Sequence, residues 1–301
     1  MLQVTLAPYH HPFKQPLQTA HGVWRCREGL IVTLTDASSR QGQGEIAPLP
    51  TFGSETLSAA IAYCKALGDR CLRANLEHIP DHLPACQFGF ATALQALDNP
   101  TPPIQLDIAQ VAHLIPLSRA VLPQMQALQA QGATTFKCKI GVQDLAQEMA
   151  IWQALSQHAL PTTRFRLDAN GGLTPALAEQ WLALAQARGN VEFLEQPLPP
   201  TQFDAMQTLA ERFTVPIALD ESVAGWADLQ QCYRAGWRGV YGLKLAIAGA
   251  PQRLIEFCCT HDLDLVCSSV FETAIGRQGA LRVAQALKTQ RPLGFGVQNW
   301  F

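Results

Sequence analysis

Between residues 111 and 297, short apolar segments alternate with longer stretches of helical periodicity. The strand-like segments are 111–117, 134–141, 164–170, 191–197, 216–222, 239–247 and 263–270, with 293–297 as a candidate eighth. The stretches between them place apolar residues at spacings of three and four, which is typical of amphipathic helices. Strands that alternate with helices form parallel sheets with right-handed crossovers. Eight such units within about 200 residues predict a closed barrel, at the short end of the usual size.

An open, doubly wound sheet is the alternative architecture. Sheets of that kind bind nucleotides at glycine-rich turns that lead into a helix. Neither GxGxxG nor GxxxxGK[ST] opens any of the helical stretches of this chain. The barrel is therefore the preferred prediction.

The first hundred residues differ from the rest in their predicted secondary structure. LQVTL, GLIVTLTD and QGQGEIAP are typical of antiparallel strands separated by turns, and the segments near 55–68 and 87–98 have helical spacing. The proline-rich segment DNPTPPIQ, residues 98–105, suits a linker. We therefore expect a small α+β domain over residues 1–100 and a barrel domain over residues 101–301.

Polar side chains occur late in successive strands of the predicted barrel. They are 24 to 29 residues apart, about one strand–helix unit each: Lys139, Asp168, Glu195, Asp220, Lys244 and Ser268. The ends of parallel barrel strands meet at the C-terminal mouth, where the active sites of such barrels are built. Three carboxylates gathered there repel one another unless a cation lies among them. Hard oxygen ligands without His or Cys favour Mg²⁺, with Mn²⁺ as a substitute.

Each of these residues also has a purely structural explanation. An acid after an apolar strand often caps the next helix, and for any one acid alone this explanation is equally good. Lys244 alone is better explained as a strand end that extends its ammonium group to water. The combination of three acids from consecutive strands favours the metal site.

Two lysines one residue apart interrupt the apolar strand TTFKCKIGV. Lys137 and Lys139 must share one face of that strand, and Cys138 faces the other way. An ordinary lysine has a pKa of about 10.4, which burial and a neighbouring like charge both lower. The pair therefore predicts one neutral, basic amine beside the metal site. A Schiff-base aldolase also uses such an amine, but it does not need three carboxylates.

Composition excludes several classes of partner. The net charge is −2 without any charged block, so nothing indicates binding to nucleic acid or to a membrane surface. We find no signal peptide and no apolar run long enough for a membrane span. The nine cysteines form no CxxC pair, which favours reduced, buried thiols in a cytoplasmic protein. We expect a small-molecule substrate and no obligate protein partner.

The series KxK, DAN, EQP, DES and a later lysine resembles the enolase superfamily, in its muconate-lactonizing subgroup. The resemblance implies a modified TIM barrel, (β/α)7β, with an N-terminal α+β capping domain. GEIAPLPTFGSET (44–56), RLDANGG and CSSVFETAIG (267–276) make nearly the whole chain similar to the o-succinylbenzoate synthase family. That family dehydrates 2-succinyl-6-hydroxy-2,4-cyclohexadiene-1-carboxylate to 2-succinylbenzoate through an enediolate, for menaquinone or phylloquinone synthesis.

The resemblance also implies a role for each charged residue. The Mg²⁺ ligands would be Asp168, Glu195 and Asp220. Lys139 would remove the proton α to the substrate carboxylate, and Lys244 would place a cation across the site. Lys137 would tune Lys139 and contact the carboxylate. The middle residues of EQP and DES are expected to leave the metal unaffected.

Four further residues are candidates for substrate binding: Arg166, Asn170, Ser268 and Ser269. Arg166 shares the inward face of its strand and suits a substrate carboxylate, although pairing with a barrel acid is an equal alternative. The other three compete with turn and cap roles. The loops 19–24 and 50–53 resemble loops that close over the mouth. Phe52 is a candidate for packing on the substrate, with an exposed aromatic residue of a mobile loop as the structural alternative.

Two alternative functions remain open at this point. A racemase or epimerase of N-acylamino acids or dipeptides would use Lys139 and Lys244 as opposed bases on the same scaffold. A non-catalytic, metal-stabilised barrel would instead act as a binding protein. Replacement of Lys139 separates them, because only an enzyme depends on that amine for turnover.

Overall fold

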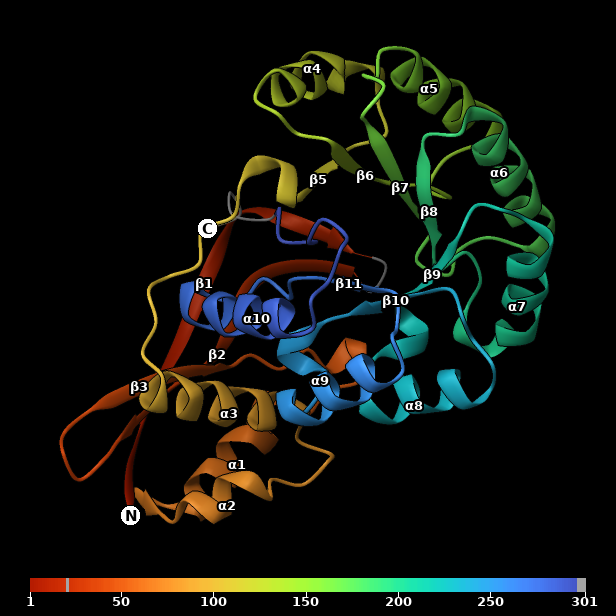
Figure 1. Ribbon diagram of the computed structural model, residues 1–301. Coiled ribbons are helices and arrows are strands. Elements are labelled where there is room, and N and C mark those ends of the chain that lie inside the picture. The colour runs from red at the N-terminus through yellow and green to blue at the C-terminus, as the bar shows by residue number, and fades with distance from the viewer. Residues whose placement is uncertain (20–21, 297–301) are drawn as a thin grey trace.

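A computed structural model describes residues 1–19 and 22–296 and contains two sheets (Figure 1). The N-terminal sheet is antiparallel, with the order β3-β2-β1-β4: β1 (Leu2–Thr19), β2 (Gly22–Thr35), β3 (Gln41–Ile46) and β4 (Arg70–Cys71). The second sheet is parallel, and each strand lies beside its neighbours in sequence: β5 (Ala112–Ile115), β6 (Thr135–Lys139), β7 (Arg164–Asp168), β8 (Val191–Glu195), β9 (Ile217–Leu219), β10 (Val240–Leu243) and β11 (Leu265–Cys267).

Helices cover both sheets. Three belong to the N-terminal part: α1 (Leu57–Leu67), α2 (Arg73–Glu77) and α3 (Pro84–Asp98). Seven follow the strands of the parallel sheet: α4 (Leu122–Ala130), α5 (Leu145–Gln157), α6 (Pro175–Arg188), α7 (Phe203–Arg212), α8 (Trp226–Arg234), α9 (Pro251–Thr260) and α10 (Ala274–Ala286). Helices α4 to α8 lie along the outer side of the curled sheet (Figure 1). No helix in the described ranges is both long and apolar enough to cross a membrane.

Up to residue 296, where the described part of the chain ends, the ring of parallel strands closes without an eighth strand. At the predicted eighth position, Leu293 forms a single bridge with Val111 and Gly294 forms one with Ser268. These bridges join the two edges of the sheet, beside β5 and β11. A Cβ atom at Gly294 would lie 2.5 Å from the Ser268 hydroxyl oxygen, so the segment passes too close to its neighbour for a larger residue. The modified barrel is confirmed, with seven strands and a bridging segment.

The sheet separates an apolar outer layer from an interior that holds the lysines and acids together with a small apolar cluster of Phe193, Ala218, Val240 and Val266. On β6, Phe136 and Cys138 are completely buried toward the helices, whereas the alternate lysines face the inside. Trp152 of α5 packs edge-on against Phe165 of β7 and against Trp181 of α6. This aromatic layer fixes the helices on the strands, because such rings each bury a large apolar area.

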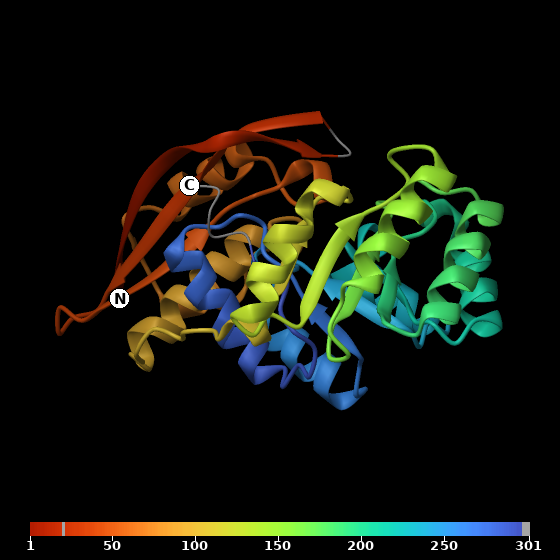
Figure 2. The ribbon, with the colours of Figure 1, turned by 90° about the horizontal axis from the view of Figure 1, so that it is seen from above.

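The first two strands are much longer than the sequence predicts. β1 was expected to end near residue 6, but it pairs with β2 from Gln3 opposite Thr35 to Thr19 opposite Gly22, with one irregularity between Pro12 and Leu17. Beyond its pairing with β4, one side of β1 is an edge, which tolerates the prolines that hid the strand. From above, the long strands arch over the N-terminal helices, beside the ring (Figure 2).

A buried carboxylate joins the N-terminal sheet to the last helix of the barrel. Glu45 of β3 is fully buried, and it accepts hydrogen bonds from the Tyr9 hydroxyl (2.5 Å) and from the backbone N–H groups of Thr273 (2.9 Å) and Gly276 (2.9 Å). It therefore satisfies free N–H groups at the start of α10. A Cβ atom at Gly276 would lie 2.6 Å from the carboxylate, so only glycine fits there.

Candidate active site

A cavity of about 550 Å³ opens at the C-terminal ends of the barrel strands. Its floor is formed by the strand ends, and part of its wall comes from the N-terminal half of the chain. The lining residues of that wall lie in the segments 22–28 on β2 and 48–52, which includes the short 3₁₀ turn η1 (Pro50–Phe52), and at Leu57 at the start of α1. The cavity is thus built from both halves of the chain.

Strand register brings the predicted residues together. Lys139 lies opposite Asp168, which in turn lies opposite Glu195, so three neighbouring strands present these side chains at one level. Asp220 follows β9 and Lys244 follows β10, and both also line the cavity. The three acids are nearly completely buried.

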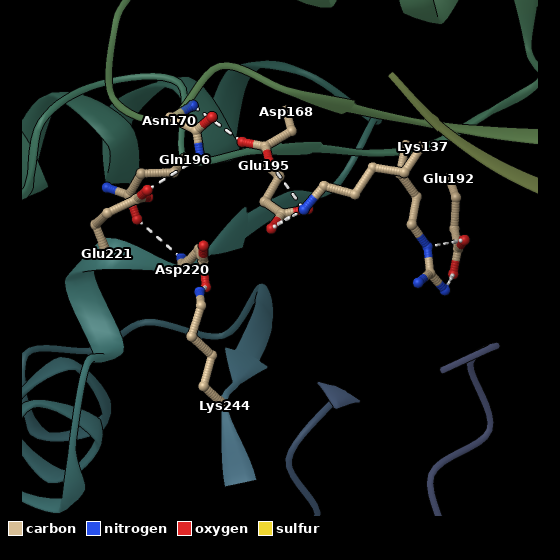
Figure 3. Close-up of polar contacts among 10 residues, drawn as sticks. Lys137, Asp168, Asn170, Glu192, Glu195, Gln196, Asp220, Glu221 and Lys244 are labelled. Atoms are coloured by element: carbon tan, nitrogen blue, oxygen red, sulfur yellow. Dashed lines mark hydrogen bonds and ion pairs between the residues drawn. The ribbon is translucent and has the colours of Figure 1, made fainter. Parts of the chain in front are cut away.

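Two lysine ammonium groups pair with the three carboxylates (Figure 3). The Lys137 nitrogen lies 2.8 Å from Asp168 Oδ2 and 2.7 Å from Glu195 Oε1. The Lys244 nitrogen donates to Asp220 Oδ1. Lys137 starts one level deeper than the acids, opposite Arg166 in the sheet, and its long side chain reaches up to them. Buried charges of this kind are stable only when they are paired.

The same pairing determines the pKa values in the cluster. Burial alone would lower the pKa of Lys137, but the nearby carboxylates outweigh it and raise that pKa well above its usual range. Burial would raise the pKa of Asp168, and Lys137 and the Asn170 backbone N–H reverse this and lower it. Glu195 has the opposite outcome: burial and then the negative charges of its neighbours exceed the effect of Lys137 and raise its pKa to about 7.

Lys139 differs from the other two lysines of the cavity. Within the described ranges it has no ion pair and no hydrogen bond through its side chain, although it lines the cavity next to Asp168. Lys137 is held as an ammonium ion by two carboxylates. The pair therefore consists of one fixed charge and one uncommitted amine.

Phe52 covers Lys244. The Lys244 nitrogen lies 3.4 Å from the centroid of the Phe52 ring, a close cation–π contact. Only 8% of Phe52 is exposed, so it is not the exposed loop residue of the structural alternative, and its contact with the substrate stays a prediction. The ring is buried because the turn that carries it folds onto the barrel mouth. Residues 20 and 21 of the other expected loop, 19–24, lie outside the described residues.

Gln196, the middle residue of EQP, is a functional residue that the sequence prediction overlooked. It is fully buried with a φ of 35°, and its side-chain oxygen accepts the backbone N–H of Asp220 (2.9 Å) and of Ser222 (3.1 Å). Its amide donates to the Ser222 hydroxyl (2.8 Å). Gln196 thus ties the end of β8 to the turn that carries the third acid. Its position directly after Glu195 was the available signal.

Glu221, the middle residue of DES, is a second functional residue that the sequence prediction overlooked. Burial, then Asp220 and Asp168, raise its pKa to about 7. Its Oε1 accepts a hydrogen bond from the Asn170 amide at 3.1 Å, while its Oε2 is buried without a partner among the described residues. Asn170 therefore lies in the cavity wall as expected, but its side chain is committed to this acid.

The structure contradicts the predicted substrate contact of Arg166. The side chain is buried below the cavity and does not line it. Its Nε and a terminal nitrogen donate to the two Glu192 oxygens, at 2.7 and 3.1 Å, and its guanidinium lies over the Phe193 ring. The alternative, pairing with a barrel acid, is the arrangement found. Glu192 also accepts from Arg291, 2.7 Å away.

We expect Arg166→Met to destabilise the protein by about 3 kcal/mol, because breaking a buried ion pair leaves an uncompensated charge. The remaining contact of Glu192 with Arg291 limits the loss. Urea unfolding should show a lower midpoint at an unchanged slope. Arg212→Met is the matched control, because its pair with Glu179 is half-exposed and should contribute less than about 1 kcal/mol. Equal losses in the two variants would contradict the buried pair.

The two serines at the end of β11 both line the cavity. The Ser269 hydroxyl donates to the Glu272 carboxylate at 2.9 Å and accepts the Phe271 backbone N–H at 3.0 Å, so it organises the turn. Phe271 has a φ of 60° and packs edge-on against Trp24 of β2. The predicted substrate contact of Ser268 stays a prediction.

The donor set of the cavity fits a hard divalent cation. The acids offer only oxygen, and the carboxylates of all three barrel acids are held by ammonium groups of the chain. One Glu221 oxygen is buried without a partner among the described residues. Oxygen donors without nitrogen or sulfur are the ligands that magnesium prefers.

Known proteins resemble this chain in sequence and in structure. Residues 1–97 match the family described as "MenC, N-terminal domain" and residues 120–299 match "Enolase C-terminal domain-like". The o-succinylbenzoate synthase of Thermosynechococcus vestitus is 41% identical over 97% of this chain and 91% of its own length. The crystal structure of o-succinylbenzoate synthase from Thermosynechococcus elongatus BP-1, with magnesium in its active site, has a TM-score of 0.92 at 39% identity, covering 99% of this chain and 94% of that one.

A more distant structure shares the fold alone. The dipeptide epimerase from Methylococcus capsulatus, in complex with magnesium and a dipeptide, has a TM-score of 0.81 at 22% identity. The similarity covers 98% of this chain and 90% of the epimerase. At that identity the likeness establishes the architecture and says nothing about the reaction.

Proposed function

This chain belongs to the o-succinylbenzoate synthase family of the enolase superfamily, and we propose that the charged residues of its cavity are the machinery of that family's reaction. It is a Mg²⁺-dependent hydro-lyase that converts 2-succinyl-6-hydroxy-2,4-cyclohexadiene-1-carboxylate to 2-succinylbenzoate, a step in menaquinone synthesis. One observation supports the assignment of roles: Lys137 and Lys244 are paired with acids, whereas Lys139 has no ion pair within the described ranges.

Asp168, Glu195 and Asp220 are the proposed magnesium ligands. They come from three consecutive strands, they are buried, and each of them is paired with one of two lysine ammonium groups. A bound magnesium ion supplies positive charge for the substrate carboxylate and for the negative charge that develops on it. The Gln196 side chain accepts the backbone N–H of Asp220, and the backbone N–H of Asn170 donates to the Asp168 carboxylate, so both contacts keep these donors in place.

Lys139 is the proposed base and acid. Its amine takes the proton from the ring carbon that bears the carboxylate, and the electron pair of that C–H bond moves onto the carboxylate, which becomes an enediolate. That pair then returns to form the new ring double bond as the C–O bond to the neighbouring hydroxyl group breaks, and Lys139 gives its proton to the departing hydroxyl so that water leaves. Lys137 lies on the same face of the strand, where Asp168 and Glu195 hold its ammonium group in place.

Lys244 is proposed to hold a permanent positive charge on the opposite side of the cavity. Asp220 and the Phe52 ring fix its position. There its ammonium group faces the developing negative charge without moving a proton. Phe52 belongs to the N-terminal part, so that part contributes to the charge distribution around the substrate as well as to its enclosure.

The direct test is to incubate the purified chain and magnesium with the cyclohexadiene substrate and to follow 2-succinylbenzoate. Formation that requires magnesium supports the proposal, and its absence contradicts it. An N-acylamino acid or dipeptide epimerase, the alternative, would exchange the α-proton of an amino-acid substrate in deuterated water. We therefore expect that any such exchange is far slower than dehydration.

Magnesium affinity should fall as the pH drops below about 7. Burial and neighbouring acids raise the pKa of Glu195 to about 7, so below that pH the carboxyl is increasingly protonated and neutral. The cation must then displace a proton, and its apparent affinity falls by up to about tenfold per pH unit. Calorimetric titration with magnesium between about pH 5.5 and 8.5 measures this. A dissociation constant that does not change with pH would remove Glu195 from the ligand set.

We also propose a domain boundary at residue 100, within the proline-rich segment 98–105, and a cytoplasmic location. The boundary is supported by the gap between the two matched ranges, which end at residue 97 and begin at residue 120. The location is supported by nine cysteines that are all free thiols. The substrate is a small carboxylate, and we propose that the enzyme needs no protein partner.

A further inference from the structure

The hairpin of β1 and β2 carries a second ligand set of different chemistry. His10 lies directly opposite Glu28 in the antiparallel register, and Cys26 lies two residues before Glu28, on the same face of β2. One ligand atom from each of the three side chains lies within 4.8 Å of the other two. The acids of the active site are held by lysines, whereas no ammonium group is paired with this set in the described ranges.

We propose that His10, Cys26 and Glu28 bind a borderline-soft divalent cation of the zinc class. Thiolate, imidazole and carboxylate are the protein ligands of zinc, and three of them leave a fourth position for water. A thiolate is a poor ligand for magnesium. The two sites would therefore prefer different cations, magnesium at the barrel acids and a zinc-class ion at the hairpin. The ion would replace the present contact between His10 Nδ1 and Glu28 Oε1, which are 3.0 Å apart.

The backbone around the three side chains is already arranged for binding. Pairing runs without interruption from Gln3 opposite Thr35 to Pro12 opposite Cys26, so the two strands are fixed relative to each other at the site. Little conformational entropy is then lost when an ion binds. The imidazole and the carboxylate are more than half exposed, with side-chain exposures of 62% and 54%, so a hydrated ion can reach them.

The site lies beside the active-site cavity and is separate from the barrel acids. Cys26 and Glu28 line the cavity wall, whereas all three barrel acids belong to the strand ends of the other half of the chain. A cation bound to the hairpin would therefore add positive charge to the wall that faces the substrate.

The test uses the full chain, saturated with magnesium, and Co²⁺ as the probe. We expect one equivalent of cobalt to produce a thiolate-to-cobalt charge-transfer band in the near ultraviolet, which oxygen ligands cannot produce, and we expect zinc to abolish it. Cys26→Ser should lose the band. His10→Gln and Glu28→Gln should each weaken cobalt binding by about tenfold or more.

Cys259→Ser is the matched control, because Cys259 is exposed on α9 and should not affect the band. Thermal unfolding of each magnesium-loaded variant checks that it is folded, and Cys26→Ala replaces Cys26→Ser if that variant is not. A band that persists without Cys26, that disappears with Cys259, or that needs millimolar cobalt would overturn the proposal. The readout is independent of turnover, so it can fail while the synthase assignment stands.

Discussion

Lys139→Ala should lower kcat by about a hundred- to ten-thousand-fold, the range that proton transfer by a positioned side chain contributes. The variant loses the amine that takes the proton and returns it to the departing hydroxyl group. Magnesium binding should be retained, because the three acids keep their positions and Lys137 remains paired with two of them. Product formation measures the first effect, and the rise in melting temperature on adding magnesium measures the second.

Lys65→Ala is the control for this experiment, since Lys65 is exposed on α1 and does not line the cavity. It should behave as the unaltered chain does in both measurements. If Lys139→Ala kept its kcat within about tenfold, Lys139 would not be the proton-transferring group. If it also lost the response to magnesium, the substitution would have disturbed the acids, and a Lys139→Met variant, which keeps the length of the side chain, would decide the point.

Glu195→Gln should abolish both turnover and the stabilisation by magnesium, and yet it should not destabilise the metal-free protein. The amide is a weak ligand for a hard cation, so the response of the melting temperature to magnesium is lost. The metal-free protein tolerates the change because burial already disfavours the charged form of this carboxyl, whose pKa is raised to about 7. Lys137 keeps its contact with Asp168.

The pH dependence of the metal-free protein provides an independent check. Between the ordinary pKa of 4.5 and about 7, the folded chain holds a proton on Glu195 that the unfolded chain has released. Stability from this group is therefore full below pH 4.5 and is lost as the pH rises toward 7 and beyond. Glu195→Gln should lack this component of the decline. An equally steep decline in the variant, measured by urea unfolding, would contradict the raised pKa.

The sequence predicts the residues at the strand ends well because a polar or charged side chain recurs once in every strand–helix unit. A polar residue at the end of each apolar run must reach the same mouth once the strands are parallel, and the register of Lys139, Asp168 and Glu195 shows that they are direct neighbours. The spacing along the chain does not tell how far below the mouth of the barrel an inward-facing side chain lies. Arg166 shares the inward face, but it lies one level lower, where Glu192 from the next strand takes its donors.

The overlooked residues act through contacts that no local pattern encodes. Phe52 reaches Lys244 across 192 positions of sequence because η1 folds onto the barrel mouth. Gln196 holds a turn 24 residues further along, which depends on a positive φ that only the tertiary structure imposes. The extent of β1 was missed for a related reason: strand pairing and an open edge accommodate prolines that local preference excludes.

The ion pairs of Lys137 and Lys244 also bear on whether the chain folds before or after it binds magnesium. Zinc fingers cannot fold before they bind their ion, because nothing else holds their ligands together. Here the counter-charges are part of the polypeptide and arrive with the strands themselves. A newly made chain can therefore complete its barrel first and acquire magnesium afterwards, by exchange, so a temporary shortage of the ion would leave a folded, idle enzyme that recovers as soon as magnesium returns.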